Sequence, residues 1–164
     1  MTVYHGSLTA VERPEIRVGE SVGDFGRGFY VTSSVDQARR FVGTKCRREG
    51  AKRGVVSVYE LDERLFSDAY KGLVFDGPTQ DWAKFVCANR KRPSFSHDYD
   101  YVRGPVANDQ VYATFAFYES GLISFEMLLD QLKVRKLFDQ ILFHTDRALG
   151  LLKFVRSEEV SWVK

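Results

Sequence analysis

His5 and Gly6 are the first residues whose types and placement suit chemistry, because they close a short strand-like run that begins at Thr2. The end of a strand presents a side chain over a cleft, and a glycine lets a ligand approach the backbone closely. The imidazole can form hydrogen bonds with ribose hydroxyls, while the amide and carbonyl of Gly6 can pair with a planar carboxamide. Taken alone, His5 is also explained as an ordinary surface or core histidine.

A second candidate element is the segment Gly26–Gly28 together with the strand-like run Phe29–Thr32. Two glycines around Arg27 indicate a tight turn that can lie against a ligand. Side chains alternate along a strand, so Phe29 and Tyr30 point to opposite faces, and one of them can line a cleft. An aromatic ring in a cleft offers a stacking surface for a flat heterocycle. A hairpin packed by aromatic side chains explains the same pattern.

These candidates need a scaffold of short strands and helices to hold them. Strand patterns cover residues 2–5, 29–32, 55–61, 99–102, 140–144 and 154–163. Helical patterns follow a cap at Ser33 or Ser34 and cover residues 78–90, 106–119, 125–132 and 146–152, while residues 47–53 are predicted to be a charged loop. This order predicts an α+β fold, and the lack of a GxGxxG motif or P-loop lysine argues against Rossmann and P-loop folds.

Composition limits the class of protein further. The chain has 164 residues, 44% of them hydrophobic, which suits one compact domain over residues 1–164. Two cysteines and three histidines without ligand spacing argue against a disulfide framework or a metal site. There is no N-terminal signal pattern and no apolar run of about 20 residues, so we expect a cytoplasmic protein without a membrane segment. The net charge of +2 does not by itself require a nucleic-acid partner.

The paired motifs resemble the ADP-ribosyltransferase superfamily, on its poly(ADP-ribose) polymerase and diphtheria-toxin side, a branch with a His-Tyr-Glu triad. Tyr4–Ser7 is similar to its Trp-His-Gly-Ser strand, and Gly26–Val31 is similar to its Gly-Lys-Gly-Ile-Tyr-Phe strand. More narrowly, the chain resembles a bacterial family of unknown function, DUF3990. The segments that carry this likeness are Tyr4–Ser7, Asp24–Tyr30, Trp82–Arg90 and Gly104–Asp109.

The superfamily resemblance implies a single-domain ADP-ribosyltransferase-like fold, with split mixed and antiparallel sheets around a central NAD cleft and flanking helices. NAD would be the co-substrate, and no metal is implied. The resemblance implies that His5 holds ribose hydroxyls, that Gly6 clamps the carboxamide through its backbone, and that Tyr30 stacks on the nicotinamide ring with Ser33 close by.

The third element of the triad departs from the superfamily pattern. Where the superfamily begins a late strand with Glu-Tyr-Ile-Val-Tyr, the best match here is the run from Gln140 to His144, which puts Gln140 at the glutamate position. A carboxylate there accepts the ribose 2′-hydroxyl and offsets positive charge that develops on the ribose, worth about 2.7–4 kcal/mol by analogy. A neutral amide can orient the hydroxyl but gives little electrostatic help. The alternative for Gln140 is a surface glutamine that begins a strand.

Three other residues can complete such a site. If the loop before the helix at residues 109–119 faces the cleft, Asp109 supplies the missing carboxylate and Asn108 a contact to ribose or acceptor. Either residue is equally a helix cap. Arg90 can bind a diphosphate bidentately, although a solvated charge at a helix C-terminus explains it as well.

Basic residues gather between Arg39 and Arg53, where seven stand against one acid, and again at Arg90–Arg92. Such runs are usually a solvated face. They can also hold the phosphates of a nucleic-acid acceptor, with Phe95 and Tyr99 available to stack on bases.

The resemblance implies an NAD-dependent mono-ADP-ribosyltransferase that modifies a macromolecular acceptor, either a protein or a nucleic acid. Compact size and family likeness suggest a bacterial toxin held by an antitoxin protein. Two alternatives stay open: a weak or inactive module that binds NAD or ADP-ribose, which the amide at Gln140 motivates, and an NAD glycohydrolase that uses water as acceptor. Formation of poly-ADP-ribose is not expected, because in the superfamily it depends on the missing glutamate.

Overall fold

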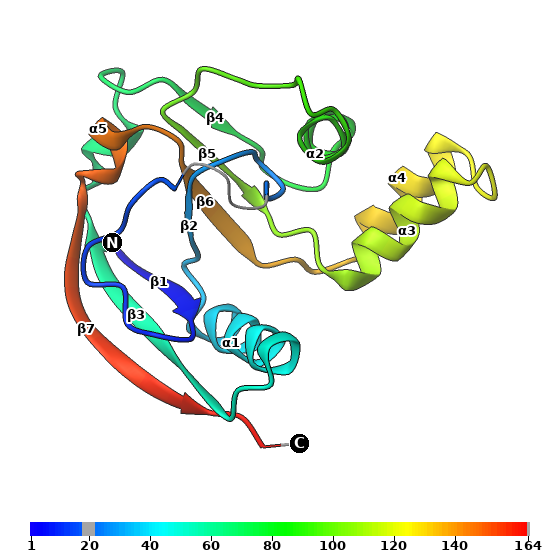
Figure 1. Ribbon diagram of the computed structural model, residues 1–164. Coiled ribbons are helices and arrows are strands. Elements are labelled where there is room, and N and C mark those ends of the chain that lie inside the picture. The colour runs from blue at the N-terminus through cyan, green and yellow to red at the C-terminus, as the bar shows by residue number, and fades with distance from the viewer. Residues whose placement is uncertain (18–21, 164) are drawn as a thin grey trace.

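The computed structural model describes residues 1–17 and 22–163, whose strands lie in two sheets (Figure 1). The first sheet is antiparallel and has the strand order β1-β3-β7. It consists of β1 (Thr2–Ser7), β3 (Arg53–Leu61) and β7 (Leu152–Ser161). The second sheet is mixed, since β4 pairs in parallel with β5, and has the order β2-β6-β5-β4. It consists of β2 (Phe29–Val31), β6 (Asp139–Phe143), β5 (Tyr101–Pro105) and β4 (Gly72–Val74).

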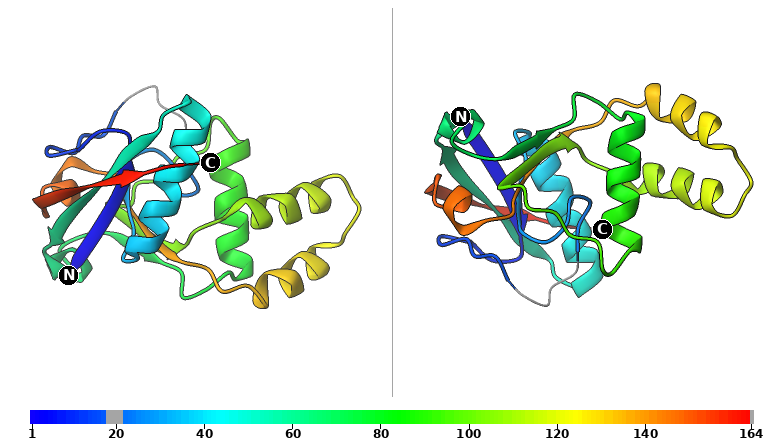
Figure 2. Two further views of the ribbon diagram at one scale, coloured as in Figure 1. Left: turned by 90° about the horizontal axis from the view of Figure 1, so that it is seen from below. Right: turned by 90° about the horizontal axis from the view of Figure 1, so that it is seen from above.

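Five α-helices and one 3₁₀ helix accompany these sheets within the described residues. They are α1 (Val35–Glu49), η1 (Glu63–Phe66), α2 (Gln80–Lys91), α3 (Asp109–Glu119), α4 (Phe125–Lys133) and α5 (Asp146–Leu149). Helix α1 packs on β1 and β3, and the hairpin of α3 and α4 extends away from the sheets (Figure 2). No helix in the described part of the chain is long and apolar enough to span a membrane.

Alternate side chains of the paired strands β2 and β6 lie in two different hydrophobic cores. Phe29 and Val31 pair with Phe143 and Ile141, and all four lie in the core shared with β1 and β3. Their neighbours along the strands, Tyr30 and Leu142, pair with each other and face the second core, beneath α2, α3 and α4. The face toward the first sheet is called the inner face below, and the other is called the outer face.

The predicted α+β class and the combination of a mixed with an antiparallel sheet are confirmed. Several local predictions are wrong. Helix α5 ends at Leu149 and not at residue 152, where β7 begins, and β5 covers residues 101–105 and not 99–102. Residues 47–49 are helical and not a loop, because α1 continues until Gly50 ends it in the left-handed conformation, with φ of 66°. Helix α3 starts at Asp109 and not at residue 106, because Asn108 caps its first turn. Ser34, and not Ser33, caps α1.

Candidate functional site

β1 meets β2 through a short bridge that leaves part of β1 with an open edge. Tyr4 and Thr32 exchange two backbone hydrogen bonds of 2.9 Å. Backbone groups two residues apart on a strand point to the same side, so the N–H and C=O of Gly6 point to the edge that Tyr4 uses and away from β3. The ladder with β3 therefore leaves the N–H and C=O of Gly6 without a strand partner among the described residues.

Gly6 is a glycine for a second reason, which the sequence did not indicate. Its Cα lies against the backbone carbonyl of Ala38 in α1, and an added Cβ would clash with that oxygen and crowd Val42. The residue is buried between strand and helix. Close packing of α1 on β1 therefore requires glycine here, whatever binds at the strand edge.

His5 lies on the inner face and has a defined protonation state. Its Nδ1–H donates to the carbonyl oxygen of Tyr30 at 2.7 Å, and its ring stacks on Phe29 with 4.3 Å between centroids. Burial lowers the pKa of His5 to about 4, an effect that the hydrogen bond to Tyr30 opposes and the positive charge of Lys45 supports. The ring is therefore neutral at physiological pH, and its Nε2 carries a lone pair that accepts a hydroxyl hydrogen bond.

Tyr30 lies on the outer face, and the preceding turn encloses its hydroxyl. That hydroxyl donates to the carbonyl of Gly26 at 2.5 Å and accepts from the amide of Phe25 at 3.0 Å. Burial raises the pKa of Tyr30. Gly26 has φ of +100°, a conformation that favours glycine, which explains part of the Gly-Arg-Gly pattern. The predicted stacking of Tyr30 on a ligand stays a prediction.

Asp139 and Gln140 point to opposite faces of β6. Asp139 lies two residues before Ile141 and so shares the inner face, whereas Gln140 shares the outer face with Leu142. His5 and Asp139 are thus on one side of the second sheet, and Tyr30 and Gln140 on the other. The His5, Tyr30 and Gln140 set inferred from the sequence is not gathered on one face.

The Asp139 carboxylate accepts hydrogen bonds on one oxygen, and its other oxygen is buried without one. Its Oδ1 accepts from the hydroxyl of Ser33 at 2.5 Å and from the Ser33 amide at 3.2 Å. Its Oδ2 lies 3.6 Å from Arg103 Nη2, too far for a hydrogen bond, and no other donor among the described residues reaches it. The side chain is 27% exposed and lines a groove of about 430 Å³ that Arg103 and Phe138 also border. Asp139 was not identified from the sequence.

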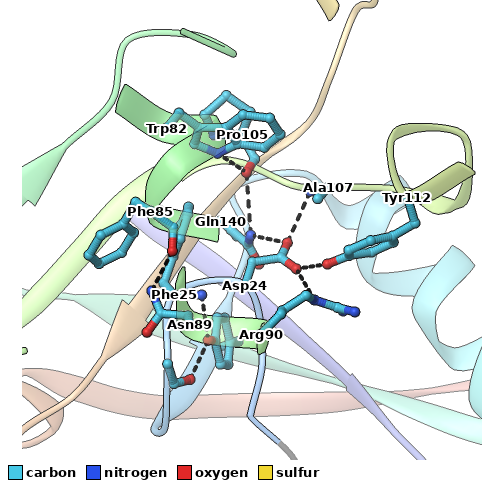
Figure 3. A network of polar contacts seen from close by, with 12 residues as sticks. Asp24, Phe25, Trp82, Phe85, Asn89, Arg90, Pro105, Ala107, Tyr112 and Gln140 are labelled. Carbon is cyan, nitrogen blue, oxygen red and sulfur yellow. Dashed lines mark hydrogen bonds and ion pairs between the residues drawn. The ribbon is translucent and has the colours of Figure 1, made fainter. Parts of the chain in front are cut away.

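Gln140 is buried and bound to another carboxylate (Figure 3). Its Nε2 donates to Asp24 Oδ2 at 2.8 Å and to the carbonyl of Pro105 at 3.3 Å. Gln140 is therefore no surface glutamine, and both of its amide hydrogens are engaged. Its other amide atom, Oε1, accepts from no donor in the described residues.

Asp24 connects four separate segments of the chain. Its two oxygens accept from the amide of Ala107 at 3.0 Å, the hydroxyl of Tyr112, Arg90 Nε at 3.3 Å, and Gln140. Burial raises the pKa of Asp24, while the amide of Ala107, Gln140 and Arg90 act in the opposite direction. Arg90 also lies over the Tyr112 ring, 3.7 Å from its centroid. This arrangement, which we call the Asp24 network, ties the turn before β2 to α2, α3 and β6.

The two remaining predicted residues lie at the start of α3. Asn108 Oδ1 accepts from the amide of Val111 at 3.0 Å and caps the helix, and Asp109 is exposed in its first turn. The carboxylate that contacts Gln140 is Asp24 and not Asp109. Within residues 1–17 and 22–163, no three metal-ligating side chains lie together.

With this geometry in place, comparison with known families gives one match. Residues 1–154 match the family described as Protein of unknown function (DUF3990). The chain belongs to the DUF3990 family. No curated protein and no solved structure matches it. Three of the DUF3990 segments meet in the Asp24 network, through Asp24, Arg90 and Ala107.

Proposed function

We propose that this DUF3990 protein is an NAD⁺-dependent mono-ADP-ribosyltransferase with an ADP-ribosyltransferase-like fold, whose cleft lies along the inner face. One observation carries the proposal: the His5 ring and the Gly6 backbone, which has no strand partner among the described residues, are neighbours at the edge of β1 that Tyr4 uses. His5 Nε2 suits a ribose hydroxyl, and the Gly6 amide and carbonyl suit the carboxamide of nicotinamide. The two-sheet arrangement supports this reading.

Asp139 is the carboxylate that best suits the reacting ribose. Its side chain is 27% exposed as a whole, and its buried oxygen beside Arg103 has no hydrogen-bond donor among the described residues, whereas the Asp24 oxygens are all engaged. In the reaction the bond from C1′ to the nicotinamide nitrogen breaks, and its electron pair leaves with nicotinamide. An acceptor nucleophile then forms a bond to C1′ and loses its proton to solvent. A carboxylate beside the ribose stabilises the positive charge that develops there.

Gln140 serves the site indirectly in this proposal, by holding β6 against the Asp24 network. Asn108 and Asp109 belong to the start of α3, and Arg90 is engaged with Asp24 and the Tyr112 ring in the Asp24 network, so this proposal assigns it no contact with the diphosphate. As the sequence suggested, we regard the protein as a bacterial toxin restrained by an antitoxin partner.

Labelled NAD⁺ incubated with cell lysate tests the proposal. Transfer of label to macromolecules should fall by about 10²–10³-fold in Asp139→Asn, a loss typical of one removed electrostatic contact in a transition state. His5→Ala should reduce it similarly. The matched control is Asp109→Asn, an exposed carboxylate that should leave transfer unchanged.

The two alternative functions give different products. Free ADP-ribose without labelled macromolecule indicates an NAD glycohydrolase. Binding of NAD⁺ without release of nicotinamide indicates a binding module. Robust labelling that survives both His5→Ala and Asp139→Asn would refute the assignment of the site.

A further inference from the structure

The exposed side of α1 carries arginines that pair with no carboxylate in the described part of the chain. Arg40, Arg47 and Arg48 are exposed and spaced at i, i+7 and i+8, which places them on one side of the helix, away from the buried residues of α1. Among the described residues none of the three forms an ion pair. Nearby acids are engaged elsewhere, since Glu158 pairs with Arg39 and Glu159 pairs with Arg53.

Aromatic rings lie between these charges. Phe41 is 43% exposed, and Lys45 Nζ lies 5.2 Å from its centroid. Arg40 lies over the ring of Phe138 at 5.2 Å, and Arg47 lies over the ring of Trp162 at 5.6 Å. A surface that combines guanidinium groups with one exposed ring, Phe41, suits a polymer with phosphates and flat bases better than a protein surface. We call Arg40, Phe41, Arg47 and Arg48 the α1 surface.

The α1 surface starts at the candidate site. The cap of α1, Ser34, follows directly after Ser33, whose hydroxyl binds Asp139. Arg40 covers Phe138, which precedes Asp139 in the chain. From Arg40 to Arg48 the helix rises about 12 Å, at 1.5 Å per residue. That length matches about two to four successive phosphates of one strand.

We propose that the α1 surface binds a single-stranded nucleic acid and that this polymer is the acceptor of the reaction at Asp139. The assignment of the acceptor rests on the proposed transferase function. A single strand fits because its bases can leave their stack, and one of them can then enter the site while its neighbours stack on Phe41. The arginines bind the backbone phosphates without reading the base sequence.

Fluorescence anisotropy of the full chain with a labelled single-stranded RNA of mixed sequence tests the surface without NAD⁺. The triple variant Arg40→Gln, Arg47→Gln, Arg48→Gln should bind at least tenfold more weakly at 0.1 M salt. Its slope of log affinity against log salt should shrink by about 2, at about 0.7 for each phosphate contact. Phe41→Ala should weaken binding by about tenfold and leave that slope unchanged, because stacking carries no charge.

A second triple variant serves as the matched control. Arg13→Gln, Lys84→Gln, Lys153→Gln removes the same three charges from exposed positions outside α1, so it should keep wild-type affinity within about twofold. Equal weakening in both triple variants, or no binding by the wild type, would overturn the proposal. Single-stranded DNA of the same sequence should bind through the same arginines, because phosphates are common to both polymers.

The labelling reaction connects the surface to the chemistry. With labelled NAD⁺, nuclease and not protease should remove the label, and the α1 triple variant should label less while it still releases nicotinamide. Protease-sensitive label that forms equally well in this variant would overturn the acceptor assignment but leave the transferase proposal intact. RNA binding through α1 without any release of nicotinamide would overturn the transferase proposal but leave the nucleic-acid surface intact.

Discussion

Replacing Gln140 by glutamate places a second buried carboxyl group next to that of Asp24. In the wild type, Gln140 Nε2 donates to Asp24 Oδ2 at 2.8 Å. A glutamate at this position has no hydrogen to donate unless it keeps its proton. Glutamate is also the residue that the superfamily pattern places in this region, so the substitution would otherwise be expected to favour turnover.

The expected cost follows from protonation. Holding a carboxyl of ordinary pKa, about 4.3, in its neutral form at pH 7 costs about 4 kcal/mol, at 1.36 kcal/mol per pH unit. Leaving both groups ionised costs about 6 kcal/mol at this separation in an effective dielectric of about 20. Protonation is therefore the cheaper outcome. The folded state raises the pKa of the new glutamate, so the destabilisation grows as pH rises, from about 1 kcal/mol at pH 5 to about 4 kcal/mol at pH 7.

Urea denaturation between pH 5 and pH 8, followed by tryptophan fluorescence, measures this cost. Gln140→Met is the control, because it removes the same donor without a charge and should cost about 1–3 kcal/mol at every pH. The double variant Asp24→Asn, Gln140→Glu restores a donor and acceptor pair and should recover at least half of the loss at pH 7. If Gln140→Glu costs as much at pH 5 as at pH 8, the two side chains do not face each other as described.

Three further substitutions test other parts of the structure. Gly6→Ala should cost about 1–3 kcal/mol in the free energy of unfolding, because the added methyl group meets a backbone carbonyl of α1. Asp100→Asn should cost about 2 kcal/mol at pH 7, since Arg147 holds the pKa of Asp100 at about 2. This contribution is present above about pH 4 and is lost as pH falls toward 2, so wild type and variant should converge in acid. Tyr30→Phe should cost about 1 kcal/mol by removing the hydrogen bond to Gly26, measured in the same urea titration.

Most of the fold could be predicted because its elements carry local signals. β3 is rich in valine, which favours strands, α4 shows the period of an amphipathic helix, and Ser34 and Asn108 have the side chains that cap helices. β4 was not predicted because it is only three residues long and only its central residue is partly buried. So short a segment shows no clear alternation of apolar and polar side chains. Helix α1 was predicted too short because arginines near its end were taken for a loop, although arginine favours helices.

The candidate site could be predicted only where its residues are neighbours in sequence. His5 and Tyr30 lie in short motifs, and both were identified. Asp24 lies in a recognised motif, but its sequence neighbours do not indicate a role for it. Its hydrogen-bond partner Gln140 lies 116 residues away. Asp139 was missed because a shift of one residue along a strand exchanges its faces. The pattern Glu-Tyr-Ile-Val-Tyr can equally be placed with Asp139 at its acidic position, and only the register of β2 with β6 separates the two readings.

The Asp24 network has a consequence for how the chain folds. The side-chain partners of Asp24 lie far along the chain, 66 residues later at Arg90 and 116 residues later at Gln140. Closing loops of this length costs chain entropy before any contact is gained, so the network forms late. A growing chain that ends before β6 leaves the Asp24 carboxylate without Gln140. The link from the turn before β2 to β6 is thus completed only when nearly the whole domain has been synthesised, whereas the enclosure of the Tyr30 hydroxyl by Phe25 and Gly26 needs only local contacts.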